Sequence, residues 1–168
     1  WFSIILRLFF VVGIAGGTFL IAANRPLTLI VSSNKYLFDG LPLVYLFVSL
    51  GSLAFGGFQI ISRLYDLEKK VYQNSFNWIF AMILNIVCNL LLIPLWGLVG
   101  AAVATGATFV IGFLLSLKKR PKRIEIRVPW IKILVVISVS FFAAYSYAIF
   151  KETDVTIVTG LLVAVLFS

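Results

Sequence analysis

Two apolar segments joined by a proline turn decide the fold of this chain: residues 85–108 read NIVCNLLLIPLWGLVGAAVATGAT. Asn85 and Asn89 are four residues apart, so they share one face of a helix that ends at Pro94. After the turn, small residues recur at spacing four in two adjacent stripes: Gly97, Ala101 and Thr105, and Gly100, Ala104 and Thr108. Small residues at this spacing let helix backbones approach closely in lipid, and amides bond across helices. The stretch predicts a tight hairpin of two membrane helices. Whether the asparagines only fasten helices or also line a site stays open.

The composition of the whole chain agrees with a membrane environment. Of 168 residues, 62% are hydrophobic and 12% are charged, whereas soluble domains carry roughly a quarter of charged residues. A soluble domain of this composition would expose large apolar patches to water. The sequence therefore excludes an ordinary soluble globular domain.

Six apolar runs follow one another, at residues 1–23, 41–62, 75–93, 97–117, 129–150 and 155–168. A span needs about 20 apolar residues, and its backbone groups must bond within their own segment, as in a helix. Barrel strands would be shorter and would alternate. We expect an all-α polytopic transmembrane helix bundle, with a loop over residues 24–40 and a charged connector over residues 64–70. Trp1 is not a start methionine, and the sixth run is expected to be truncated.

Lysine and arginine predict the orientation of these runs. Ten of them lie on the two connectors that follow runs two and four or at their edges, and three lie on the opposite side, with Arg7 set aside inside the first run. Positive residues prefer cytoplasmic loops. The connector 64–70 and the basic loop 118–128 are therefore expected in the cytoplasm. The first run is then expected to cross from the cytoplasmic side to the outer side of the membrane.

Residues that support chemistry are scarce. The chain has no histidine and one cysteine, Cys88, inside an apolar run, so we expect no metal, haem or disulfide framework. No phosphate loop or nucleophile–base motif is present. The chain has a net charge of +8, and its basic residues lie mostly between the apolar runs and not on one face of a soluble domain. Nucleic acid is therefore not an expected partner. We expect no cofactor and no enzyme.

Lys132 lies just inside the start of the fifth run, so Arg7 is the one charge well within a run. Two interpretations of Arg7 remain open. It would snorkel to the cytoplasmic interface if the first span begins upstream. Alternatively, it would face a polar cavity and bind an anionic substrate, because intramembrane charges commonly face a bundle interior or an aqueous path.

The stretch from Asn85 to Thr105 also resembles the C-terminal half of polysaccharide flippases of the Wzx type, members of the MOP superfamily of transporters. The segment Pro26–Leu37 and the connector 64–70 resemble other parts of that family. The resemblance implies that residues 1–117 belong to the C-terminal lobe of a larger transporter, with two additional helices over residues 129–168. It implies a multi-pass protein of the cytoplasmic membrane.

The function implied is translocation of a lipid-linked oligosaccharide by alternating access, with Arg7, Asn85 and Asn89 as candidate substrate-binding residues. Membrane lipids and a coupling cation are the other expected partners. Two alternatives stay open: an ion-coupled exporter of small molecules from the same superfamily, and a membrane-embedded glycosyltransferase or purely structural assembly. A drug exporter would favour an apolar aromatic cavity with few cations.

Overall fold

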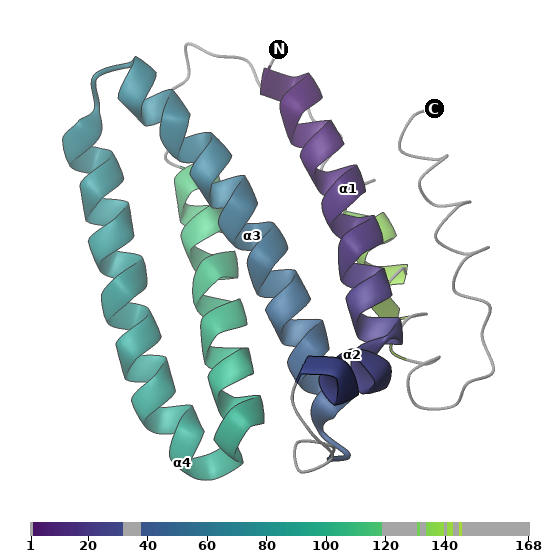
Figure 1. Cartoon of the computed structure of the whole chain (residues 1–168). Coiled ribbons are helices and arrows are strands. Elements are labelled where there is room, and N and C mark those ends of the chain that lie inside the picture. Colours follow the sequence, from purple (N-terminus) through teal and green to yellow (C-terminus); the bar gives the residue numbers. More distant parts are fainter. Residues whose placement is uncertain are drawn as a thin grey trace.

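The structure, a computed structural model, describes residues 2–31, 38–118, 131, 134–139, 141–142 and 145. Within these residues all regular structure is helical, and the named elements are α1 (Phe2–Ala22), α2 (Asn24–Val31), α3 (Leu41–Leu67) and α4 (Val71–Lys118). Figure 1 shows α3 between α1 and α4. The predicted basic loop, most of the fifth run and all of the sixth lie outside the described residues.

Three of these helices are long and apolar enough to cross a membrane. They are Ile4–Ala22, Leu41–Leu67 and Val71–Lys118, with mean hydropathies of 2.3, 1.8 and 2.3. Helices of this kind satisfy their backbone groups without water. The described part of the chain is therefore all-helical, with the length and composition of a membrane helix bundle.

The long helix α4 doubles back on itself (Figure 1). Residues 71–96, here the first arm, and residues 98–118, the second arm, join at Gly97, whose φ of 54° and ψ of −128° are not helical. This backbone conformation is open almost only to glycine. The predicted turn at residues 94–96 is therefore displaced: Pro94 stays helical, and the chain reverses at the first residue without a Cβ.

The sequence prediction of a loop from residue 24 is wrong for residues 24–31, which form α2. The Ala23 amide donates to the Phe19 carbonyl at 2.8 Å and the Leu27 amide to the Ala23 carbonyl at 3.1 Å, so hydrogen bonding continues through the break. Pro26 lies in the first turn of α2, where its missing N–H is tolerated. The short helix buries polar residues, and Thr28 Oγ1 lies 3.1 Å from the Tyr45 hydroxyl of α3.

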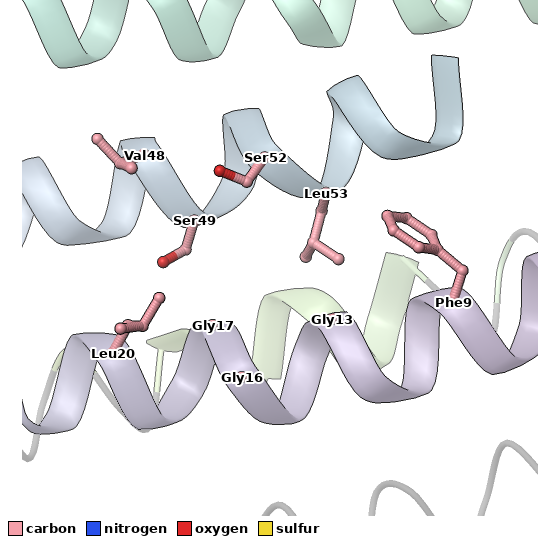
Figure 2. Close-up of a pocket in the computed structure, with 9 residues that line it drawn as sticks. All are labelled: Phe9, Gly13, Gly16, Gly17, Leu20, Val48, Ser49, Ser52 and Leu53. Carbon is pink, nitrogen blue, oxygen red and sulfur yellow. The ribbon is translucent and has the colours of Figure 1, made fainter. Parts of the chain in front are cut away.

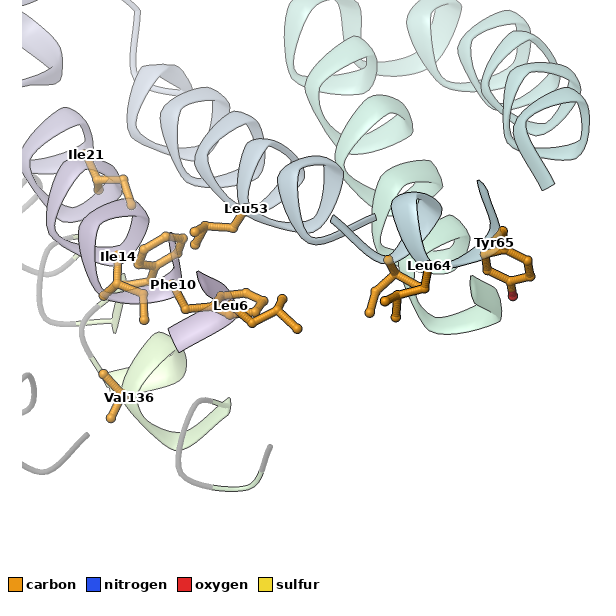
Figure 3. Close-up of a cluster of buried hydrophobic side chains, with 10 residues drawn as sticks. Leu6, Phe10, Ile14, Ile21, Leu53, Leu64, Tyr65 and Val136 are labelled. Atoms are coloured by element: carbon orange, nitrogen blue, oxygen red, sulfur yellow. The ribbon is translucent and has the colours of Figure 1, made fainter. Parts of the chain in front are cut away.

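The charged connector is also more helical than the sequence predicts, because α3 continues to Leu67. Leu64 and Tyr65 are fully buried and belong to the apolar core drawn in Figure 3. Lys69, with a φ of 56°, turns the chain into α4. Ion pairs tie the turn together, with Lys70 Nζ 2.9 Å from Glu68 Oε2.

Close backbone contact joins α3 to the second arm of α4. A Cβ added to Gly51 would lie 3.0 Å from Gly106 Cα, and one added to Gly106 would lie 2.8 Å from the Phe47 carbonyl oxygen. On the other side of α3, a Cβ on Gly13 of α1 would overlap Leu53 Cδ2. The missing Cβ atoms of Gly51 and Gly106 therefore set the spacing between α3 and the second arm, as is common in membranes.

Candidate substrate groove beside Asn85

The two asparagines of the first arm hydrogen-bond to each other. Asn89 Nδ2 donates to the Asn85 backbone carbonyl at 2.9 Å and to Asn85 Oδ1 at 3.0 Å. Both side chains are half-buried. In both hydrogen bonds Asn85 is the acceptor. The NH₂ group of Asn85 makes no hydrogen bond among the described residues, so its two N–H donors are available to another partner.

Asn85 lines a groove of about 410 Å³ between α3 and the two arms of α4. Its other lining residues are aromatic or apolar: Phe55, Trp78, Ile79, Ala81, Met82 and Phe109. The Phe55 ring lies 4.6 Å from the Phe109 ring and 5.8 Å from the Trp78 ring, between centroids. The groove therefore offers flat apolar faces with one amide donor, the composition of many small-ligand sites.

The small-residue stripes of the second arm occupy different environments. Gly100, Ala104 and Thr108 are buried, Ala101 and Thr105 are half-buried, and Gly97 is exposed at the reversal. A Cβ on Gly100 would overlap the Leu92 carbonyl oxygen, and one on Gly112 would touch Ala81 Cβ at 3.6 Å. The stripe through Gly100 thus packs the second arm against the first arm. This packing places Asn85 of the first arm beside the second arm.

The structure does not bring Arg7 together with Asn85. Arg7 is exposed on α1, and α3 lies between α1 and the first arm of α4, which carries Asn85 (Figure 1). A Cβ on Gly17 would lie 3.3 Å from Ser49 Cβ, and this antiparallel register puts Arg7 near the level of Gln59.

The depth of Asn85 follows from a neighbour on its own arm. Trp78 packs against Phe58, with ring centroids 4.5 Å apart. Because the first arm runs antiparallel to α3, Asn85 lies near the level of Gly51. At 1.5 Å of rise per residue, Arg7 and Asn85 are roughly 12 Å apart along the bundle. Arg7 therefore lies nearer the charged connector 64–70 than Asn85 does, and it is not among the residues that line the groove beside Asn85.

Sequence reasoning missed the aromatic walls of this groove, because Phe55, Trp78 and Phe109 come from three separate segments. It also missed a groove of about 230 Å³ between α1 and α3. Figure 2 shows that groove, where Gly13 lies opposite Leu53 and Gly17 opposite Ser49. Gly16 is also among its lining residues. Only the spacing of the α1 glycines signals it in the sequence.

Within the described part of the chain, no group of three or more histidine, cysteine, aspartate or glutamate side chains is placed to hold a metal ion. No protein-family model, no curated protein and no solved structure matches this chain.

Proposed function

We propose that the chain forms part of a transporter that moves a lipid-linked oligosaccharide across the cytoplasmic membrane. The observation that carries the proposal is the NH₂ group of Asn85, which lies without a hydrogen-bond partner among the described residues beside an aromatic groove. A polar group in a span is costly unless it has a partner. A bound cargo with hydroxyl oxygens supplies that partner.

The groove chemistry fits a sugar. The apolar faces of a pyranose ring pack on aromatic rings such as Trp78 and Phe109, while a hydroxyl oxygen accepts from the Asn85 amide. The resemblance of residues 85–105 to polysaccharide flippases supports the same cargo class. In such transporters, two lobes rock around a site near the midplane, so the sugar would cross while its lipid tail stays in the bilayer.

A second candidate, an ion-coupled exporter of small molecules, is favoured by one feature of the same groove. No charged residue is among its lining residues. An apolar aromatic site without cations suits a neutral or cationic amphiphile better than a pyrophosphate group. Under the flippase proposal, the phosphates of the cargo therefore bind outside this groove. Our hypothesis is that Arg7, which lies towards the end of the bundle that carries the connector 64–70, makes that contact.

The test is a flipping assay with the protein expressed from its own gene and reconstituted in vesicles. A membrane-impermeant glycosidase added outside reports how much polyprenyl-pyrophosphate-linked oligosaccharide has reached the outer leaflet. We expect Asn85→Leu to slow flipping by up to about tenfold, the worth of one hydrogen bond. Cys88→Ala, on the same arm outside the groove, is the matched control. Flipping no faster than in empty vesicles, together with active efflux of a hydrophobic dye, would establish the exporter instead.

Arg7 gives an independent check of the same proposal. Arg7→Gln should remain in the membrane and lose flipping, whereas Arg7→Lys should keep part of it, because a point charge attracts phosphate without the bidentate fork. Full flipping by Arg7→Gln would show that Arg7 only anchors α1 at the interface.

A further inference from the structure

A second groove lies at the connector end of the bundle, away from Asn85. It has a volume of about 450 Å³ and is lined by Tyr65 from the end of α3 and by Tyr72, Gln73, Phe76 and Asn77 from the start of α4. We call it the connector groove. Its lining combines phenol and amide groups with aromatic rings, unlike the largely apolar groove beside Asn85.

Asn77 gives this groove an unsatisfied hydrogen-bond donor. Its side chain is 5% exposed, and its Nδ2 atom has no hydrogen-bond partner among the described residues. The Asn77 amide lies near the Tyr65 hydroxyl, which donates to the Ser116 carbonyl at 3.0 Å. The oxygen of this hydroxyl could still accept a hydrogen bond, but Asn77 Nδ2 is not within hydrogen-bonding geometry of it. Buried polar groups are normally paired, so Asn77 Nδ2 leaves room for an acceptor from a bound molecule.

Charge indicates what kind of acceptor fits. The described residues at this end include four basic and two acidic side chains, a net charge of +2: Arg63, Lys69, Lys70 and Lys118 against Asp66 and Glu68. The bond from Tyr65 to Ser116 places Lys118 at the same end. Cations near a membrane surface attract anionic lipid headgroups. An anionic acceptor is therefore favoured over a neutral one.

An apolar track leads away from the groove along the first arm. Phe76, Phe80, Ile83 and Val87 follow one another at spacings of three and four, so they share one face of the helix. They are exposed by 54%, 41%, 53% and 45%, respectively. At 1.5 Å per residue the track is about 16 Å long, close to the roughly 15 Å of one leaflet.

We propose that the connector groove binds an anionic phospholipid of the surrounding bilayer. The headgroup phosphate accepts a hydrogen bond from Asn77 Nδ2 and lies beside Gln73, and one acyl chain follows the track from Phe76 to Val87. A soluble anion would leave this track unused, which is why we commit to a lipid. The site is independent of the cargo proposed above.

Native mass spectrometry of the purified protein in detergent tests this site by titration with phosphatidylglycerol and, separately, phosphatidylcholine. We expect tighter binding of phosphatidylglycerol. Asn77→Leu removes the donor at similar volume and should weaken that binding by roughly tenfold, as for a hydrogen bond to a charged group. Gln73→Leu, exposed in the first turn, is a second variant that stays informative if Asn77→Leu folds poorly.

Ser75→Leu is the matched control, because Ser75 lies at the same depth but is not among the groove's lining residues. It should bind phosphatidylglycerol like the parent protein. Equal binding of the two lipids by the parent would overturn the proposal, and so would unchanged phosphatidylglycerol binding in both Asn77→Leu and Gln73→Leu.

Discussion

The two arms of α4 are both apolar, yet they bury very different residues. The first arm buries only Asn77 and Ala81, although it carries large exposed side chains such as Leu90 and Leu91. The second arm buries seven residues, all of them small: Gly100, Ala102, Ala104, Gly106, Thr108, Gly112 and Ser116. In a soluble helix the large apolar residues would be inside.

This difference shows that the solvent decides which residues are buried. Lipid tails are as apolar as leucine, so no hydrophobic force drives leucines of neighbouring helices together. Helices in lipid associate where small residues let their backbones pack closely. We therefore expect the large residues of the first arm to face lipid, whereas the second arm turns its small residues to α3 and to the first arm.

The largest expected effect is the loss of close packing at the second arm. A Cβ on Gly100 would overlap the Leu92 carbonyl oxygen, so Gly100→Leu must push the arms apart. We expect at least a several-fold fall in the yield of folded protein, measured by size-exclusion chromatography after membrane extraction. Gly16→Leu is the control, because nothing lies within 4 Å of a Cβ at Gly16. Equal yields of both variants would contradict close packing of the arms.

A smaller effect is expected at the reversal between the arms. Gly97 has a φ of 54°, and strained conformations of this kind cost about 1–3 kcal/mol in residues with a Cβ. Gly97→Ala should lower the free energy of unfolding by that amount, measured by denaturant titration in micelles. Gly16→Ala, at a helical position, should instead stabilise the protein by up to about 1 kcal/mol. A stabilised Gly97→Ala would place the reversal at another residue.

The same contrast explains what the sequence could predict. Helical spans and their apolar character follow from composition and run length, because lipid leaves the backbone few options. Helix α2 was missed because Asn24 and Pro26 are ordinary loop residues, and only tertiary contact makes this segment helical: Thr28 meets the Tyr45 hydroxyl. The wall of the Asn85 groove was missed because Phe55, Trp78 and Phe109 are distant in sequence.

A still smaller loss of stability is expected where α3 meets the end of the second arm. The Tyr65 hydroxyl donates to the Ser116 carbonyl at 3.0 Å, and both groups are buried. Tyr65→Phe should lower the free energy of unfolding by about 0.5–1.5 kcal/mol, the worth of one such bond. Tyr72→Phe should change nothing, because Tyr72 is 85% exposed. Identical unfolding curves for parent and Tyr65→Phe would show that the bond contributes no net stability.

The smallest expected effect is at the large residues of the first arm, where the comparison of the arms is tested most directly. Leu90 is 71% exposed and Leu53 of α3 is 4% exposed. If the first arm faces lipid, the Leu90 side chain contacts acyl chains both in the folded bundle and in separated helices. Leu90→Ala should then change the free energy of unfolding by less than about 0.5 kcal/mol, as for other surface positions.

Leu53→Ala provides the contrast, because Leu53 packs against Gly13 and its truncation leaves a cavity that costs about 2 kcal/mol or more. Both variants are compared by unfolding in the same micelles. If Leu90→Ala destabilised the protein as much as Leu53→Ala, Leu90 would pack against protein. The first arm would then lie at a helix interface, and the rule that small residues mark the packed face would fail for half of α4.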